Sequence, residues 1–170
     1  KSSSAYSALV TWLSIYGKDD KGWDLVERMT RNMNLVIRSS LVFQQVGRGE
    51  YPIGVTYEEG AFNYVLAGTA GIVYPSDGTL LEAEGMFIVK GSRNPNAARA
   101  FADYLLSAGA QSELATKFPG RRPTRKGVAT HPEMIPADRL KVIDYDSKWG
   151  AESRKDILDR MQRIIVKTQG

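Results

Sequence analysis

Residues 50–79 read EYPIGVTYEEGAFNYVLAGTAGIVYPSDGT, and this stretch decides the fold class that the sequence predicts. The short apolar run at residues 53–56 has the small and β-branched side chains of a buried strand in a parallel sheet. Residues 58–66 then show a helical pattern, and residues 71–74 form a second apolar run. We therefore expect a strand, a helix and another strand, which is the repeating unit of an α/β protein.

The same alternation extends to both sides of this stretch. A third apolar run at residues 35–37 predicts another strand, and residues 80–90 predict a long strand that crosses between two lobes. Helical periodicity or capping residues predict helices at residues 6–16, from residue 22 to about 32, at 39–46 with Ser39 or Ser40 as the cap, at 95–105, at 111–118 and from about residue 151. The predicted fold is an α/β three-layer lobe with a mostly parallel sheet, together with part of a second lobe.

The composition is that of a folded domain of average polarity. Among 170 residues, 42% are hydrophobic and 25% are charged, and the absence of cysteine excludes disulfides and thiolate metal sites. The formal net charge is +4, but no five like charges stand together. The basic excess therefore indicates either a solvated surface or attraction of an anionic solute, a membrane surface or nucleic acid.

The sequence offers little for catalysis. The single histidine, His131, lies in a proline-rich loop at residues 119–136, away from any serine and aspartate arrangement that suits a triad. No phosphate-binding loop, dinucleotide fingerprint, zinc-protease motif or nucleophile elbow is present. We expect a protein that is not an enzyme and that holds no cofactor or metal.

Three groups of polar residues are candidates for binding a ligand. Ser2, Ser3 and Ser4 stand at the start of a predicted helix, where hydroxyls and unpaired N–H groups favour an anion, although a single serine would suffice as an ordinary cap. The others follow predicted strands, at the edge where open α/β sheets bind ligands, and comprise Tyr57, Glu58 and Glu59 in one group and Asp77, Gly78 and Thr79 in the other. The two glutamates would serve equally as first-turn acids of a helix, and residues 75–79 as a plain turn.

Several phrases of the sequence resemble the second half of extracellular solute-binding proteins of ABC importers, in the branch that transports ferric ions, hexose phosphates and phosphonates. The matching phrases are SSSAYSALVTWLSIYG at 2–17, VGRGEYPIGVTYEEG at 46–60, AGIVYPSDGT at 70–79 and GMFIVKGSRNPNAARAFADYLLS at 85–107. The last is the most specific, because it joins the step Lys90-Gly91, the cap Asn94-Pro95 and a helix that ends at Ser107. The resemblance covers nearly the whole chain.

The resemblance implies a type II periplasmic-binding fold, in which two lobes close on a solute. Residues 1–80 would form the second, ligand-gripping lobe, and residues 81–170 the crossing strand and the returning part of the first lobe. Ser39 or Ser40 would face the cleft, and Glu82 would join Glu58 and Glu59 in contacting solute hydroxyls. The implied partners are a small anionic solute, such as a sugar phosphate or phosphonate, and a membrane permease, with no nucleic acid.

The resemblance also sets the expected location and the alternatives. The protein would act in the periplasm or outside the cell, associated with the membrane through its transporter, and would dimerise if the chain is truncated, because apolar surface would then be exposed. Ferric-ion members have adjacent tyrosines in the helix after the strand, whereas Glu59, Gly60, Ala61 and Phe62 stand here, which disfavours iron. A ferric-ion-binding member and the effector-binding domain of a transcriptional regulator remain the alternatives.

Overall fold

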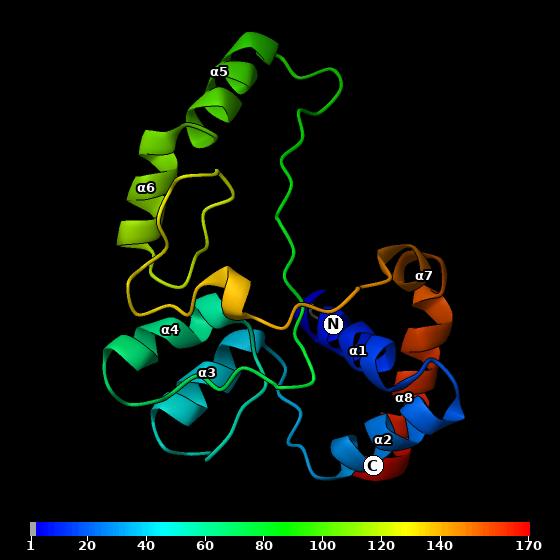
Figure 1. Cartoon of the computed structure of the whole chain (residues 1–170). Coiled ribbons are helices and arrows are strands. Elements are labelled where there is room, and N and C mark those ends of the chain that lie inside the picture. Colours follow the sequence, from blue (N-terminus) through cyan, green and yellow to red (C-terminus); the bar gives the residue numbers. More distant parts are fainter. Residues whose placement is uncertain (1–2) are drawn as a thin grey trace. The chain divides into compact units, whose positions relative to one another are not determined.

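The computed structural model describes residues 3–170, and this part of the chain is folded into helices (Figure 1). Turns and extended segments join the helices. The bounds are α1 Ser3–Tyr16, α2 Asp20–Arg31, α3 Ser39–Gly47, α4 Glu58–Leu66, α5 Pro95–Leu105, α6 Ala108–Lys117, α7 Ser147–Glu152 and α8 Arg154–Gln169, with a short 3-10 helix η1 at Ala137–Arg139.

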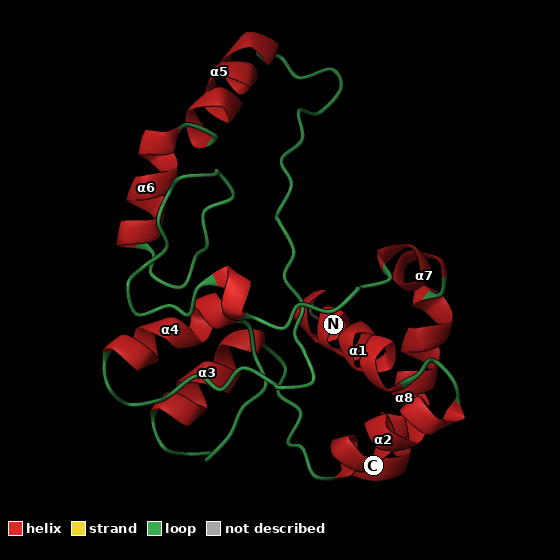
Figure 2. Cartoon of the chain, viewed as in Figure 1, coloured by secondary structure: helices red, strands yellow, loops and turns green. Residues whose placement is uncertain are grey.

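The predicted α/β fold with its mostly parallel sheet is wrong for the described residues. Figure 2 shows helices and loops and no strand in this part of the chain, and the β-pairing within residues 3–170 is one isolated parallel bridge between Thr79 and Val142. A three-layer lobe and a type II periplasmic-binding fold require a sheet, so neither is supported. A strand forms only where a neighbour about 4.8 Å away accepts its backbone hydrogen bonds, and an apolar run does not reveal whether that neighbour exists.

The segments predicted as strands are instead extended loops with exposed apolar side chains. Ile53 is 82% exposed, Val73 is 90% exposed and Phe87 is 89% exposed. These side chains are apolar and are of the kind that is usually buried in a sheet. The backbone of the segments that carry them forms no ladder of hydrogen bonds. The prediction that these apolar runs are strands of a sheet is therefore wrong for the described residues.

Most helices form where the sequence predicts them. The helix α4 has the predicted bounds, α5 begins with Pro95 after Asn94, and α1 ends before Gly17, whose φ of +114° suits glycine. The prediction that Ser39 or Ser40 caps the third helix is wrong. Arg38 is the N-cap residue of α3 and makes no side-chain cap, so both serines lie in the first turn of the helix.

The described chain divides into two compact units that are discontinuous in sequence. Unit 1 contains residues 3–56, 73–81 and 140–170 of the described chain, and unit 2 contains residues 57–72 and 82–139. The helices α1, α2, α3, α7 and α8 belong to unit 1, and α4, α5 and α6 belong to unit 2. These units do not test the predicted division of the chain into two lobes at residue 80, which stays a prediction.

The core of unit 1 lies where α1, α2 and α8 pack together. The apolar stripe that the sequence predicts on α1 is buried and consists of Tyr6, Leu9, Val10 and Leu13, of which Val10 and Leu13 are completely inaccessible to solvent. The stripe packs in one cluster with Trp23 and Val26 of α2, and Ile157 and Ile164 come from α8. The i, i+3, i+4, i+7 spacing of the α1 stripe predicted its buried face correctly.

Unit 2 is organised around Phe62 of α4, which is 1% exposed. The ring of His131 meets it edge-on, with ring centroids 5.5 Å apart, and Met134 is buried in the same unit. Gly120 brings the proline-rich loop against α4, because a Cβ at this glycine would lie 2.7 Å from the Cβ of Phe62. The loop is therefore packed on the helix and not merely solvated.

No helix within residues 3–170 combines the length and the apolar character that a membrane span requires.

Candidate functional site

The N-termini of α1 and α3 meet at two serines. The hydroxyl oxygens of Ser4 and Ser39 are 3.0 Å apart, and both side chains are partly buried. Neither helix has an acidic residue in its first turn. Because first-turn N–H groups lack acceptors within the helix and the N-terminus is the positive end of its dipole, two positive helix ends and at least two hydroxyls converge here.

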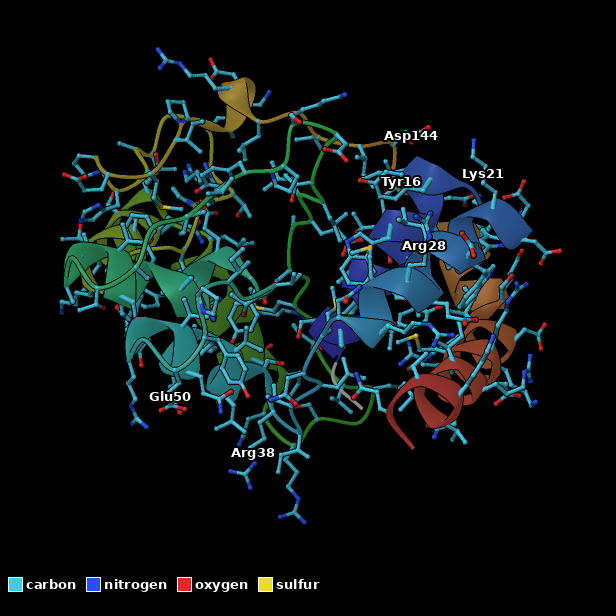
Figure 3. All side chains as sticks on the ribbon, turned by 90° about the horizontal axis from the view of Figure 1, so that it is seen from below. Tyr16, Lys21, Arg28, Arg38, Glu50 and Asp144 are labelled. Carbon is cyan, nitrogen blue, oxygen red and sulfur yellow. The ribbon has the colours of Figure 1, made fainter. Side chains whose placement is uncertain are left out.

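Ser3, Ser40 and Arg38 are the neighbours of the two contacting serines in the sequence. Ser3 is exposed in the first turn of α1, and Ser40 is half-buried in the first turn of α3. Arg38, the N-cap residue of α3, is exposed and its side chain projects away from the ribbon (Figure 3). Ser2 lies outside the described residues. Hydroxyl donors at helix N-termini are suited to a phosphate or carboxylate.

The polar turn at Asp77, Gly78 and Thr79 lies at the opposite end of α1. The hydroxyl of Tyr16, the last residue of α1, donates a hydrogen bond to Asp77. Twelve residues separate Ser4 from Tyr16, which corresponds to about 18 Å along a helix. The turn and the two contacting serines are therefore too far apart to hold the two ends of one small solute.

The backbone of this turn is already used within unit 1. The N–H of Thr79 donates to the carbonyl of Lys141 at 2.9 Å, and its carbonyl accepts from the N–H of Ile143 at 3.0 Å. Gly78 has a φ of +129°, and a Cβ there would lie 2.5 Å from the Cγ2 atom of Ile143. The bond from Tyr16 lowers the pKa of Asp77 and raises the pKa of Tyr16. These contacts give the turn a structural role.

The acidic candidates at the start of α4 are held by two arginines. Arg122 donates from Nε and Nη2 to the two carboxylate oxygens of Glu58, at 2.8 and 2.7 Å. Arg121 donates from Nε to Glu59 at 2.9 Å and from Nη1 to Glu84 at 3.2 Å. Both glutamates also lie in the first turn of α4, where a negative charge stabilises the helix dipole. Their carboxylate oxygens therefore already have donors within unit 2.

The other two candidates of unit 2 are exposed. Tyr57 is the N-cap residue of α4 and is 40% exposed, and it makes no side-chain cap. Glu82 is exposed at the beginning of the extended segment that leads to α5. The predicted site residues are thus divided between the units, with the serines and residues 77–79 in unit 1 and residues 57–59 and Glu82 in unit 2.

The sequence reasoning missed three partners of these candidates. Arg121 and Arg122 lie in the predicted proline-rich loop, but the sequence did not reveal them as the counter-ions of the α4 acids, and Tyr16 was not linked to Asp77. The available signal was the pairing of two adjacent arginines with two adjacent glutamates. Glu58 and Arg122 are 64 residues apart, and a pairing over this distance produces no periodic pattern in the sequence. The pairing becomes visible only in the folded structure.

The described residues contain no group of three or more histidine, cysteine or acidic side chains that is placed to hold a metal ion. His131 packs against Phe62, and its Nδ1 atom accepts a hydrogen bond from the N–H of Glu133 at 3.3 Å. These contacts give the one histidine a structural role in unit 2.

Comparison with known proteins identifies related sequences. The family model described as "Bacterial extracellular solute-binding protein" matches residues 2–141. An uncharacterised protein of Haemophilus influenzae is 31% identical over 166 residues, which are 92% of this chain and 46% of that protein. The chain thus spans about half the length of this curated relative. No solved structure matches the chain with significance.

Proposed function

Because the chain belongs to the family of bacterial extracellular solute-binding proteins, we propose that it takes part in capturing a small anionic solute for import by an ABC transporter. The proposed solute is a sugar phosphate or a phosphonate. The proposed place of action is the periplasm or the cell exterior, and the proposed partner is the permease in the membrane. This role requires binding and release of the solute and no chemical step.

The contact between Ser4 and Ser39 is the observation that supports an anionic solute. Two helix N-termini that lack acidic first-turn residues meet at hydroxyls 3.0 Å apart. The N-terminus of an α-helix carries the equivalent of about half a positive charge, because the dipoles of its peptide groups are aligned. A phosphate or phosphonate oxygen is a suitable acceptor for such donors, whereas an uncharged sugar would gain little from the two helix dipoles.

The acids of unit 2 contribute less to this proposal than the sequence suggested. Glu58 and Glu59 are engaged by Arg122 and Arg121, so a solute would have to compete with those arginines for the carboxylate oxygens. Glu82 is exposed and remains a candidate for contacting solute hydroxyls. We therefore assign the recognition of the anion to the serines.

The test is a binding experiment on the full chain with glucose 6-phosphate and 2-aminoethylphosphonate, with glucose and ferric citrate as comparison solutes. A ligand that binds the folded state raises the melting temperature by mass action. We expect the two phosphorus compounds to raise it and glucose to leave it unchanged. A rise with ferric citrate alone would support the ferric-ion alternative, and no response to either phosphorus compound would contradict the proposal.

A pair of variants locates the site. Ser39→Ala removes one hydroxyl of the contact, and Ser112→Ala removes an exposed hydroxyl from α6 as the matched control. A hydrogen bond to a charged group contributes about 1.5–3 kcal/mol, so Ser39→Ala should weaken binding roughly tenfold or more. Equal affinities in the two variants would remove the serines from the site while leaving solute binding intact.

A further inference from the structure

A groove lies between α2 and α8 in unit 1, and it has a volume of about 300 Å³. The two helices lie side by side (Figure 1). We refer to it as the α2–α8 groove, and its lining residues are Asp20 and Glu27 of α2 and Arg160, Arg163, Ile164 and Lys167 of α8. Ile164 is 7% exposed and belongs to the buried core. The groove therefore combines a charged lining with one apolar residue of the core.

Two of the three cations in the groove are paired with carboxylates across the helices. Arg160 is 2.8 Å from Asp20 and lies over the ring of Trp23. Lys167 is 2.7 Å from Glu27, which also pairs with Arg31. These pairs hold the long side chains of α8 in place along α2. They also leave the groove with more positive than negative groups.

Arg163 is the third cation of the groove, and it takes part in neither of these ion pairs. It lies between Arg160 and Lys167 on the same side of α8, because the three residues are spaced by three and four positions. Within residues 3–170 no carboxylate oxygen lies within 4.0 Å of its guanidinium, although its charge lowers the pKa of Asp159 from a greater distance, after the larger effects of Lys155. Its side chain is exposed and accessible to a partner.

Most of the excess positive charge of the protein is located on α8. The helix has five basic residues and two acidic ones, which gives it a net charge of +3, whereas the whole chain has a net charge of +4. The three acidic residues of α2 are balanced by its three basic residues. A surface with this imbalance attracts negatively charged partners and increases their association rate.

We propose that the α2–α8 groove is a docking surface for an acidic segment of a partner protein, with Arg163 as its main contact. A small solute is a poorer occupant, because sites for small molecules enclose most of the ligand, whereas Asp20 is 95% exposed and Lys167 is 62% exposed. A short acidic segment can place a carboxylate at Arg163 without placing others against Asp20 and Glu27. The dense phosphates of nucleic acid or of an anionic membrane would also lie against these two carboxylates, so both are poorer occupants. This proposal does not depend on the proposed solute.

The test measures binding of the full chain to a synthetic helical peptide with glutamates along one face. The matched peptide has glutamine at the same positions. We expect binding of the glutamate peptide that weakens as salt concentration rises, because the attraction between exposed charges is screened. The variant Arg163→Gln should weaken this binding roughly three- to tenfold.

The control variant is Arg93→Gln, which removes the same charge from an exposed position of unit 2. It should change the affinity by less than about twofold. Equal losses in the two variants would overturn the proposal, because they would indicate a general charge effect. Arg163-dependent binding to phosphatidylserine vesicles or to DNA, without binding to the peptide, would overturn it as well.

The charge-reversed variant Arg163→Glu provides a second measurement. It should abolish binding of the glutamate peptide and allow binding of a peptide with lysines at the same positions. Tryptophan fluorescence, which reports on unit 1, shows whether the Arg163 variants are folded. A folded Arg163→Glu variant that still binds the glutamate peptide with unchanged affinity would contradict the proposal.

Discussion

Arg122 contacts both carboxylate oxygens of Glu58, which places a bidentate ion pair at the first turn of α4. The side chains are only 11% and 20% exposed. Bidentate pairs of arginine and carboxylate combine two charge-assisted hydrogen bonds with a fixed geometry. We infer that this pair fixes the proline-rich loop to α4 and is the main electrostatic contact within unit 2.

Replacing Arg122 with alanine should destabilise unit 2 by about 1–3 kcal/mol, because the partly buried carboxylate of Glu58 would lose its bidentate donor. Hydrogen exchange of the α4 amides measures the effect. Tryptophan fluorescence does not, since Trp12, Trp23 and Trp149 all lie in unit 1. The control is Glu59→Gln, whose more exposed pair should cost less than about 1 kcal/mol. Unchanged exchange in Arg122→Ala would contradict the inferred role.

Gly120→Ala should also destabilise unit 2. Gly120 has a φ of +95°, and a Cβ there would lie 2.7 Å from the Cβ of Phe62 and 2.8 Å from the Cα of Glu59. Gly91→Ala is the matched control, because Gly91 has a φ of +83° and nothing within 4 Å of an added Cβ. The control should cost about 1 kcal/mol from backbone strain alone, and Gly120→Ala about 1–3 kcal/mol more. Equal losses of exchange protection would show that the loop does not pack tightly on α4.

Leu13→Ala tests the core of unit 1. Leu13 is fully buried among residues of α2 and α8, so the substitution should lower the free energy of unfolding by about 2–5 kcal/mol. Val166→Ala removes side-chain carbons from a 63% exposed position of α8 and should change it by less than about 0.5 kcal/mol. Urea unfolding followed by tryptophan fluorescence measures both, and similar midpoints for the two variants would contradict the assigned core.

Asp146 should contribute a pH-dependent part of the stability of unit 1. Its pKa lies below the usual 3.8, first because Lys18 donates a hydrogen bond and then because the N–H of Trp149 does so at the start of α7. A lowered pKa in the folded state means that the contribution is present above about pH 4 and is lost as the pH falls through the folded value. Asp146→Asn should therefore lower the urea midpoint at about pH 7 and have little effect at about pH 2. Asp144→Asn, at an exposed neighbouring carboxylate, is the control, and a pH-independent difference between the variants would contradict the prediction.

The exposed extended segments predict self-association at high concentration. Phe87 and Val89 are 89% and 76% exposed in a segment without a ladder, and unpaired extended backbone with apolar side chains favours pairing between molecules. Light scattering over a range of concentrations should detect dimers, and Phe87→Ser should reduce them more than Phe101→Ser on the exposed surface of α5. A monomer at every concentration would contradict this prediction.

The sequence predicted local features well and long-range features poorly. The bounds of α4 and the Asn94-Pro95 start of α5 depend on residues within one or two helical turns, so periodicity and capping preferences were sufficient. The prediction of strands was wrong for a different reason. A run such as residues 53–56 favours an extended backbone, but the sheet requires a second segment at the right distance.

In the candidate site, too, local features were predictable from the sequence and long-range contacts were not. A helix start at the N-terminal serines was predictable, whereas the contact of Ser4 with Ser39 depends on how α3 packs within unit 1. The engagement of Glu58 by Arg122 likewise joins residues 64 positions apart. Periodicity identified the buried stripe of α1 because a helix places those four residues on one face, but it gave no information about which distant residues would meet them.

The interleaving of the two units has a consequence for synthesis on the ribosome. The hydroxyl of Tyr6 bonds to the carbonyl of Gly150, 144 positions later, and Lys167 pairs with Glu27 across 140 positions. The first helices of unit 1 must therefore wait for α7 and α8 to emerge, while unit 2 is translated between them. At roughly 5–20 residues per second, the part of the α1 stripe that α8 covers stays exposed for roughly 7 to 28 seconds, and we expect chaperones to bind the nascent chain during that interval.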